Sequence, residues 1–562
     1  MVQPQWRIVE KAPPASIDEA LEVLLKNRGV GPSFLNSTLK DLEVHLAMRG
    51  MDEGAELMAR HLEEGHKIVL VGDYDCDGIT SVAQMSLFLR EIGYTSYEVV
   101  IPLRAEGYGM PERALRDHSD AGLFVVMDCG TLDVKPISMV RALGADCIVI
   151  DHHEVPDKGL APATVLINPK QPLCHSPFKE FCSSGLTLLF LARLRRALKG
   201  SFATPNLGGK YLALATIGTV ADIVPLVDAN RILTRSGLGC INARTFAPVQ
   251  RIVEGAGITA RTLTAGHVGY YVGPRINAAG RIADARIAFD LLMAEQPEEV
   301  VRLAQELNRL NARRQQQEDT ILSEIRARFT EGDSGKRTLV MGDPKWPAGV
   351  IGIVASKIQQ ELLYGPTIIL SFDESQGVAR GSARSIPGFD IHSALKACDD
   401  LLLKWGGHKM AAGLTVALDR LGAFAQRFET VAREHPADIF FPTGKVDAEL
   451  DLALVSPELL NALRQLEPHG MGNPTPTFAV RGAKVNVQKT FGRKRDHLRL
   501  VVDDRIGAIY WRGASRFQSG QWKSGELLDV VFQVEWDDMY GKPVLNVKDM
   551  GHFFGNRSNS SD

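Results

Sequence analysis

The stretch VGDYDCDGIT, residues 71–80, places Asp73, Asp75 and Asp77 at alternate positions directly after an apolar run. Like charges this close together repel one another. A solvated turn can also collect acidic residues without having any function. The rest of the sequence decides between these two interpretations.

Three short apolar runs in the first third of the chain have the length and composition of buried strands. They are KIVLVGD (67–73), LFVVMDCG (123–130) and DCIVIDHH (146–153). Helical patterns such as SVAQMSLFLREIG (81–93) lie between them. This alternation predicts an α/β fold with a parallel sheet and helices on its faces.

Each of the three runs ends in side chains that can bind a ligand. These are Asp73 with its neighbours, Asp128, and Asp151 with His152 and His153. Ligands of open α/β sheets bind at the carboxyl ends of the strands, so the three ends could converge on one point. A further acid, Asp222, lies in the apolar segment LALATIGTVADIVPL. Burial of a lone aspartate is costly unless it is paired or binds a metal.

Together these side chains suit divalent metal ions. The set is Asp73, Asp75, Asp77, Asp128, Asp222 and His152, with His153 beside it. Carboxylates suit Mg²⁺ and Mn²⁺, and imidazole shifts the preference toward Mn²⁺. Two ions about 3.5–4 Å apart would use this much negative charge and would serve phosphoryl transfer. A solvated turn, structural histidines and a helix-capping Asp128 remain the alternatives, whereas an EF-hand would need a downstream glutamate.

The later part of the chain divides into further segments. PEEVVRLAQELNRLNARRQQQEDTILSEIRARF (297–329) predicts one long charged helix, and strand–helix alternation resumes near Thr338. After about Val446, short alternating strands indicate a small antiparallel barrel. The predicted segments are an N-terminal extension (1–45), a catalytic α/β domain (46–290), a connector helix (291–332), a smaller α/β domain (333–440) and the barrel (441–555).

Composition indicates a cytoplasmic protein without a membrane partner. The N-terminus has no apolar signal region, and no stretch reaches the ~20 apolar residues of a membrane span. The seven cysteines are scattered without a CxxC, as expected for reduced thiols. The net charge of −3 gives no hint of a nucleic-acid partner, but it does not exclude a basic groove.

At this point the motifs are recognisable as a family pattern. DYDCDG, MDCG, DHH and GTVAD, in this order, resemble the motifs of the DHH phosphoesterase superfamily. GGHKMAAG (406–413) resembles the signature of the DHHA1 domain, and LEPHGMGNPTPTF (466–478) resembles the entry to the OB-like domain of the RecJ exonuclease family. The resemblance extends over about residues 20–550. It implies a DHH parallel-sheet catalytic domain, a long connector helix, a smaller α/β DHHA1 domain and a C-terminal OB-like β-barrel.

The resemblance also implies a two-metal site that binds Mn²⁺ or Mg²⁺. The implied ligands are Asp75, Asp77, Asp128, His152 and Asp222. Asp73 would be a ligand or lie close behind one, His153 would contact the scissile phosphate or the attacking water, and Asp151 would orient a histidine. Many superfamily members have a histidine four residues before Asp75. Val71 stands at that position here, so one family ligand is missing or replaced.

Basic and aromatic residues predict a path for nucleic acid. The candidates are Arg104, Tyr108, Arg275, Arg281, Ser382, Arg384, His408, Lys489, Phe491 and Arg493. Arginine forks with hydroxyls suit phosphate, and basic residues around an aromatic in an OB-like fold suit a single strand. For a single arginine, a surface salt bridge is the alternative, and for the barrel residues it is a solvated hairpin.

The function implied is a single-stranded-DNA-specific 5′→3′ exonuclease of DNA repair and recombination that releases 5′-mononucleotides. Its implied partners are single-stranded DNA, single-strand-binding protein and a DNA helicase. Two other functions stay open. One is a DHH enzyme that acts on short substrates, and the other is a DNA-binding scaffold without catalysis.

Overall fold

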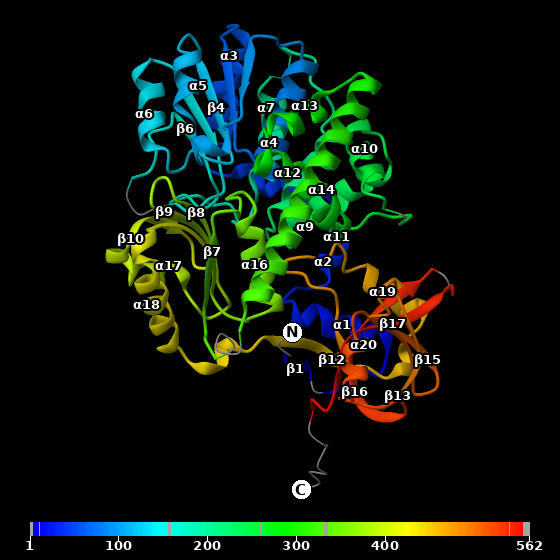
Figure 1. Ribbon diagram of the computed structural model, residues 1–562. Coiled ribbons are helices and arrows are strands. Elements are labelled where there is room, and N and C mark those ends of the chain that lie inside the picture. The colour runs from blue at the N-terminus through cyan, green and yellow to red at the C-terminus, as the bar shows by residue number, and fades with distance from the viewer. Residues whose placement is uncertain are drawn as a thin grey trace. The chain divides into compact units, whose positions relative to one another are not determined.

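The computed structural model describes residues 4–10, 12–155, 159–198, 200–258, 260–330, 335–538 and 540–554. The chain forms two compact units (Figure 1). The first consists of Met1–Pro32, Gln315–Leu466 and Thr475–Asp562, and the second of Ser33–Arg314 and Glu467–Pro474. The domain boundaries expected from the sequence stay predictions.

The second unit contains a five-stranded sheet in which every neighbouring pair is parallel. Its order is β3 (Tyr97–Val100), β2 (Ile68–Gly72), β4 (Leu123–Met127), β5 (Asp146–Ile150) and β6 (Val165–Ile167). Gly72 pairs with Met127, and Met127 pairs with Ile150. The strands therefore end at the same level, which confirms the predicted parallel sheet and places the residues that follow them side by side.

Alternate residues of the strands pack into two separate cores. Ile68 and Leu70 of β2 face one core, whereas Val69 and Val71 face the other. The first core includes residues of α4 (Cys76–Glu91), α7 (Ser183–Ala197) and α8 (Lys210–Ala221), and the second includes residues of α5 (Glu112–Asp117) and α6 (Val134–Ala142). Burial on both faces explains why the strands are continuously apolar.

Further helices complete this unit (Figure 1). They include α2 (Ser33–Asn36), η1 (Leu39–Ala47), α3 (Met51–Glu63), α9 (Asp228–Asn242), α10 (Ala247–Gly255), α11 (Ala265–His267), the π-helical turn η3 (Val268–Val272), α12 (Gly273–Ile282) and α13 (Arg286–Met293). The predicted long helix is a single helix of 32 residues, α14 (Pro297–Arg328). None of the helices in the described part of the chain is long and apolar enough to span a membrane.

The first unit contains a smaller mixed sheet. Its order is β10 (Leu402–Gly407), β11 (Ala411–Ala417), β9 (Val378–Arg384), β8 (Thr367–Asp373) and β7 (Leu339–Asp343). Only the β7–β8 pair is parallel. Helix α16 (Ile351–Glu361) packs against β8 and β9, and α17 (Ile391–Lys396) and α18 (Leu421–Arg433) contribute to the core of this sheet.

The barrel in this unit closes through a second pairing of its first strand. Its order is β13 (Phe478–Phe491), β14 (His497–Val502), β15 (Ile506–Tyr510), β17 (Lys542–Gly551) and β16 (Glu526–Asp537), and β16 pairs with β13. The β15–β17 pair is parallel. The barrel is therefore not antiparallel throughout, contrary to the expectation from the sequence. Outside the barrel, β12 (Thr443–Glu449) pairs with β13 and with β1 (Gln5–Glu10), and α1 (Ile17–Asn27) and α19 (Pro457–Arg464) lie nearby.

Candidate metal centre

The acidic loop after β2 leads directly into helix α4. Asp75 caps the helix, since its Oδ1 accepts hydrogen bonds from the N–H groups of Asp77 (2.9 Å) and Gly78 (3.1 Å). A side chain at position 78 has no room, because a Cβ there would lie 2.5 Å from the backbone N and O of Asp73. The alternating acids therefore belong to a tight, glycine-dependent turn at the end of the strand.

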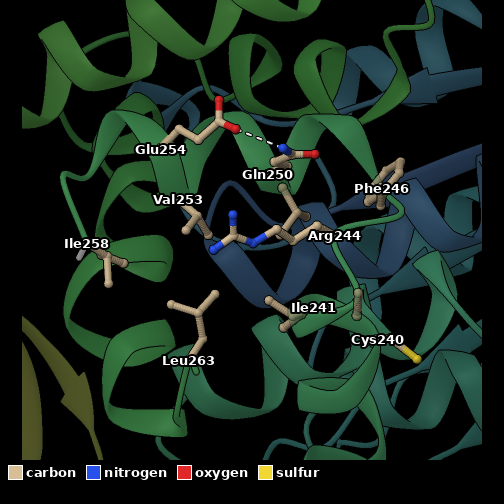
Figure 2. Close-up of a pocket in the computed structure, with 11 residues that line it drawn as sticks. Cys240, Ile241, Arg244, Phe246, Gln250, Val253, Glu254, Ile258 and Leu263 are labelled. Carbon is tan, nitrogen blue, oxygen red and sulfur yellow. Dashed lines mark hydrogen bonds between the residues drawn. The ribbon is translucent and has the colours of Figure 1, made fainter. Parts of the chain in front are cut away.

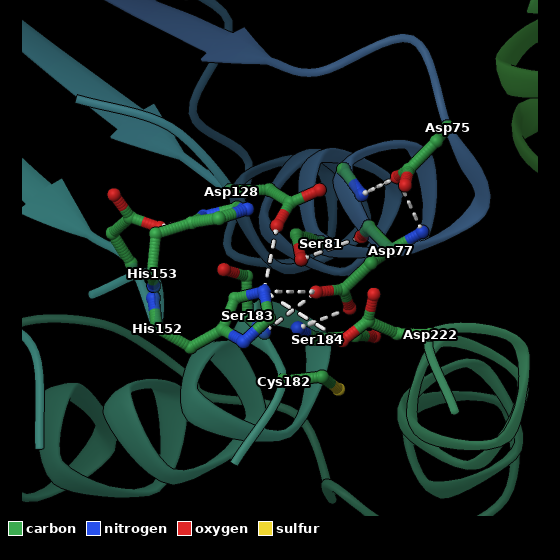
Figure 3. A network of polar contacts seen from close by, with 12 residues as sticks. Asp75, Asp77, Ser81, Asp128, His152, His153, Cys182, Ser183, Ser184 and Asp222 are labelled. Atoms are coloured by element: carbon green, nitrogen blue, oxygen red, sulfur yellow. Dashed lines mark hydrogen bonds and ion pairs between the residues drawn. The ribbon is translucent and has the colours of Figure 1, made fainter. Parts of the chain in front are cut away.

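Asp77 is fully buried and held by the first turn of α7. Its Oδ2 accepts from the Ser183 N–H at 2.7 Å, and its Oδ1 accepts from the Ser184 N–H at 2.8 Å (Figure 3). A helix N-terminus favours negative charge. Even so, burial and the charge of Asp75 raise the pKa of Asp77 to about 6. Sequence reasoning missed Ser183 and Ser184, because their contribution comes from backbone N–H groups.

Asp128 follows β4 in a left-handed backbone conformation with φ +64°. Its N–H donates to the Ile150 carbonyl at 3.0 Å, which ties it to the end of β5. The residue is 2% exposed. Burial and the charge of Asp77 raise the pKa of Asp128 well above its ordinary value.

His152 is the point on which the acids converge. Its Nε2 lies 3.3 Å from Asp128 Oδ1, 3.7 Å from Asp77 Oδ2 and 3.7 Å from Asp222 Oδ2 (Figure 3). Burial and the charge of His153 lower the pKa of His152 to about 4, so the ring is neutral at physiological pH. A neutral imidazole is the form that binds a metal.

The ligand atoms fall into overlapping groups whose members lie within 4.8 Å of one another. One group is Asp77, His152 and Asp222, another is Asp73, Asp75 and Asp128, and a third is Asp128, His152 and His153. The first two groups share no residue. They adjoin one another, because Asp128 of the second group lies 3.3 Å from His152 of the first. Two neighbouring ions would satisfy this arrangement better than one.

Three buried polar atoms in the centre support this interpretation. Asp73 Oδ1, Asp128 Oδ1 and His152 Nε2 have no hydrogen-bond partner within the described residues. Burial and the charge of Asp75 also raise the pKa of Asp73 to about 8. Buried polar atoms in proteins are normally satisfied, and the oxygen-rich set with one nitrogen fits Mn²⁺ or Mg²⁺. Divalent cations would therefore offset the repulsion among the aspartates.

Asp151, His153 and Tyr108 form a hydrogen-bonded chain beside the candidate metal ligands. Asp151 Oδ1 lies 2.7 Å from His153 Nδ1. The Tyr108 hydroxyl lies 3.0 Å from the same nitrogen and donates to the Asp128 carbonyl at 3.1 Å. Burial alone would raise the pKa of Asp151, but the hydrogen bond and charge of His153 outweigh burial and lower it. Likewise, although burial opposes it, Asp151 raises the pKa of His153.

Helix α12 carries two of the predicted arginines and contacts the acidic loop. Asn277 Oδ1 accepts from the Cys76 N–H at 2.9 Å. Arg104 Nε donates to the Gly280 carbonyl at 2.9 Å. Arg275 Nε and Nη1 donate to Asn308 and to the Tyr271 carbonyl, both at 2.7 Å, whereas Arg281 lies in the last turn.

In the first unit, Ser382 and Arg384 lie together on β9. Arg384 Nη1 donates to Ser382 Oγ at 3.0 Å, and its Nε donates to Ser356 Oγ at 3.1 Å. A Cβ at Gly352, in the first turn of α16, would lie 3.0 Å from Arg384 Nη2. Ala411 of β11 pairs with Arg384, and the His408 N–H donates to the Ala411 carbonyl at 2.8 Å. A guanidinium, two hydroxyls and a helix N-terminus suit a phosphate group.

The barrel brings Lys489, Phe491 and Arg493 to the β13–β14 hairpin, beside aromatics that sequence reasoning missed. The ring centroids of Phe491 and His497 lie 5.2 Å apart, and those of His497 and Trp511 lie 4.9 Å apart. Trp511 is 50% exposed. The segment YWRG, an aromatic beside an arginine after a strand, was an available signal for Trp511.

A small pocket between α9 and α10 is lined by none of the candidate metal ligands. Its volume is about 80 Å³, and its lining includes Cys240, Ile241 and Val253 (Figure 2). The Gln250 amide donates to the Glu254 carboxylate at its edge, at 2.8 Å. Among the described residues, the groups of acids and histidines close enough to share an ion all belong to the centre around Asp128 and His152. The candidate metal-binding site therefore lies at the carboxyl ends of the parallel strands.

Comparison with protein families gives three matches along the chain. Residues 67–219 match the DHH family, N-terminal domain; residues 335–434 match the DHHA1 domain; residues 446–549 match the RecJ OB domain. Their order is the order expected from the motifs.

Two curated relatives are similar over most of the chain, and both are named single-stranded-DNA-specific exonuclease RecJ. The Escherichia coli protein is 33% identical over 97% of this chain and 95% of its own length. The Bacillus subtilis protein is 32% identical over 92% of this chain, which spans 65% of that relative's length.

Solved structures of RecJ from Thermus thermophilus share the fold. The Mn²⁺ complex has a TM-score of 0.82 and is 28% identical, covering 97% of this chain and 79% of that one. The Mg²⁺ complex has a TM-score of 0.76 at 28% identity, covering 97% and 78%. Both metals are the ones that the donor atoms around His152 suit.

Proposed function

The chain belongs to the RecJ family of single-stranded-DNA-specific exonucleases, and we propose that it degrades single-stranded DNA in the 5′→3′ direction and releases 5′-mononucleotides. The observation that carries the proposal is the pair of adjacent ligand groups around His152. Their carboxylates are crowded, and three of their atoms are buried without hydrogen-bond partners among the described residues. A centre of this kind suits phosphodiester hydrolysis with two divalent ions.

The proposed roles follow from the contacts of each side chain. The metal ligands are Asp75, Asp77, Asp128, His152 and Asp222, with Asp73 as a ligand or directly behind one. When bound, two divalent ions supply the positive charge that activates a water and stabilises the phosphoryl-transfer transition state. The N-terminus of α7 keeps Asp77 in one orientation through Ser183 and Ser184.

His153 is proposed to act on the scissile phosphate. Its Nδ1 lies 2.7 Å from Asp151 and 3.0 Å from the Tyr108 hydroxyl, whereas its Nε2 has a longer contact of 3.4 Å with that hydroxyl, so Nε2 is the atom proposed to face the substrate. The raised pKa of His153 keeps a larger fraction of the ring protonated near neutral pH. A protonated ring donates a hydrogen bond to a phosphate oxygen and stabilises the charge that develops there.

The Ser382–Arg384 cluster is proposed to bind the phosphate at the 5′ end of the strand. Arg384 is held by Ser356 and Ser382 next to the first turn of α16. This environment supports selection of a terminal phosphate, because such a group carries more charge than an internal one. The 5′→3′ direction would follow from this selection. His408 lies on the neighbouring hairpin and would supply a further donor.

The aromatic and basic hairpin of the barrel favours a long strand over a short substrate. Phe491, His497 and Trp511 contact one another, and Lys489 and Arg493 lie on the same hairpin. OB-fold proteins bind strands by stacking bases on aromatics beside basic residues. A role in DNA repair and recombination, with single-strand-binding protein and a helicase as partners, completes the proposal.

The test uses a single-stranded oligonucleotide labelled separately at its 5′ and 3′ ends. Wild type and Asp128→Ala are incubated with Mn²⁺, with Mg²⁺ and with EDTA. We expect the 5′ label to appear first as a mononucleotide, only with metal and only with wild type. A parallel series of strands from 2 to about 30 nucleotides measures length preference.

Each other outcome points to a different function. A strand that is bound but never cut with either metal would make the protein a DNA-binding scaffold. Equal kcat/KM for dinucleotides and long strands would indicate a DHH enzyme of short substrates. Release of the 3′ label first would reverse the proposed direction and remove the role assigned to Arg384.

A further inference from the structure

Two tyrosines on the π-helical turn η3 are unusually exposed for their size. Tyr270 is 83% exposed and Tyr271 is 44% exposed. Single π-helical turns are rare within helices and are frequent at functional sites. Neither tyrosine has a role in the metal centre or among the residues proposed to bind phosphate.

The turn lies directly against the end of α8, where Asp222 is located. A Cβ at Gly269 would lie 3.4 Å from Val220 Cγ1, and one at Gly273 would lie 2.9 Å from the Cβ of Ala221. These two neighbours immediately precede Asp222 in the chain. The exposed tyrosines therefore belong to a turn that packs next to a metal-ligand candidate.

The helix that continues from the turn is joined to the acidic loop. Arg275 Nη1 donates to the Tyr271 carbonyl at 2.7 Å, which fixes the turn to the start of α12. Further along the same helix, Asn277 accepts from the Cys76 N–H at 2.9 Å. The turn is thus tied on both sides to segments that carry the metal ligands.

The ring of Tyr271 is already held by another ring. His267 and Tyr271 stack with centroids 6.2 Å apart and an interplanar angle of 27°. A held, solvent-facing ring on a turn that packs against the last residues of α8 is suited to a nucleobase, because every base presents a flat face and stacking tolerates any sequence. We propose that Tyr270 and Tyr271 form a base-stacking subsite for the DNA strand whose phosphate is cut. This inference rests on the proposed exonuclease function.

The test uses strands that carry one abasic position, moved stepwise from the 5′ end. With wild type and Mn²⁺, we expect kcat/KM to fall by about 5- to 100-fold when the abasic position reaches the subsite, and little elsewhere. Tyr270→Ala should lower kcat/KM for the intact strand by a similar factor and should flatten the abasic profile. Tyr270→Phe keeps the ring and should retain the wild-type profile.

A second measurement does not depend on cleavage. With EDTA present, 2-aminopurine placed at the sensitive position should be quenched by wild type and by Tyr270→Phe, but not by Tyr270→Ala. Leu173→Ala, at a side chain that is 77% exposed elsewhere, is the matched control and should behave as wild type. Unchanged melting temperatures would show that all variants are folded.

The outcomes separate this inference from the function on which it rests. A Tyr270→Ala, Tyr271→Ala double variant with the wild-type abasic profile and quenching would overturn the subsite while leaving the exonuclease intact. A wild-type protein that cuts no single-stranded DNA with Mn²⁺ would instead overturn the proposed function. Loss of profile and quenching in the alanine variants, with recovery in Tyr270→Phe, would support the subsite.

Discussion

Asp128 combines a left-handed backbone, a buried carboxylate and an Oδ1 without a hydrogen-bond partner in the described residues. Each feature costs free energy in the absence of a cation, and such costs concentrate at functional sites. The like charge of Asp77 adds to them, as the raised pKa of Asp128 indicates. We therefore expect Asp128 to be a metal ligand whose burial lowers the stability of the metal-free protein.

The substitution Asp128→Asn tests whether metal binding by Asp128 is offset by lower stability of the metal-free protein. The variant keeps the shape of the side chain but removes a buried negative charge, so we expect its metal-free melting temperature to equal or exceed that of wild type. Mn²⁺ should stabilise wild type in proportion to RT ln(1 + [Mn²⁺]/Kd), whereas the variant should gain little. Thermal unfolding with and without MnCl₂, and Mn²⁺ binding followed by electron paramagnetic resonance, measure both effects.

Asp117→Asn is the matched control, because Asp117 is exposed and paired with Arg116. It should show the wild-type response to Mn²⁺. A variant at position 128 that binds Mn²⁺ as tightly as wild type would remove this carboxylate from the set of ligands.

At the scale of elements, the orientation of Asp77 depends on close packing of α4, α7 and α8. Thr80 Oγ1 donates to Ser184 Oγ at 2.9 Å, and Gln84 Nε2 donates to the same oxygen at 2.8 Å. Gly218 of α8 faces this network, since a Cβ there would lie 2.4 Å from Ser184 Cβ and 2.7 Å from Thr80 Oγ1. Displacement of α7 would therefore move the N–H groups that hold Asp77.

Gly218→Ala should force these helices apart. We expect a loss of about 1–3 kcal/mol in the free energy of unfolding, as for other overpacked cores, together with weaker Mn²⁺ binding. Gly239→Ala on α9 is the control, because nothing lies within 4 Å of its Cβ position and alanine favours a helix. Urea denaturation and Mn²⁺ titration of both variants test the idea, which fails if Gly218→Ala retains wild-type stability and affinity.

The buried His45, at the contact between η1 and α9, leads us to expect a pH-dependent free energy of unfolding. Its side chain is 2% exposed, and Nε2 lies 3.4 Å from Asp228 Oδ1. Burial lowers the pKa of His45 despite the opposing charge of Asp228. The unfolded chain therefore binds the proton more readily, so the free energy of unfolding should fall as pH drops below about 6.5.

His45→Gln removes this titration and should reduce the dependence of unfolding free energy on pH between 7.5 and 5. The reduction in slope should be at most about 1.4 kcal/mol per pH unit, the value for one proton. Urea denaturation across this range measures it, with His175→Gln at an exposed histidine as the control. Identical slopes for His45→Gln and wild type would contradict the assignment.

Sequence patterns predict secondary-structure elements, and the side chains that gather at the strand ends, better than they predict backbone contacts. The convergence of Asp73, Asp128 and His152 was predictable because parallel strands end at one edge of a sheet. The anchoring of Asp77 by Ser183 and Ser184 was not, since any residue supplies a backbone N–H. The parallel β15–β17 pair was also missed, because strand alternation is the same in parallel and antiparallel barrels.

For the whole molecule, the proposed functions are distributed over two compact units. The metal centre belongs to the unit Ser33–Arg314, whereas the Arg384 cluster and the barrel belong to the other. Helix α14 runs through the boundary between them at Arg314. If both units bind the same strand, binding of long DNA and hydrolysis of a short substrate should respond differently to substitutions in the barrel.

Substitutions in the basic loop of the barrel test whether binding of long DNA can be separated from hydrolysis of a short substrate. Arg493, Lys494 and Arg495 are exposed between β13 and β14. Replacing all three with alanine should raise KM for strands of about 30 nucleotides and reduce the slope of log K against log [salt] by about 2, at ~0.7 for each phosphate left without its basic partner. Hydrolysis of a dinucleotide should be unchanged, because none of the residues proposed to bind the scissile or the terminal phosphate lies in the barrel.

The control removes the same charge elsewhere. Arg116, Arg302 and Arg309 are exposed and paired with neighbouring carboxylates, so their triple alanine variant changes net charge equally without removing a basic cluster. If local phosphate contacts matter, the slope of log K against log [salt] for this control should equal that of wild type. If only net charge matters, the slope should be reduced as much as in the loop variant. A loop variant that loses dinucleotide hydrolysis as well would show that the barrel supports the metal centre itself, because the loop is proposed to bind long strands only.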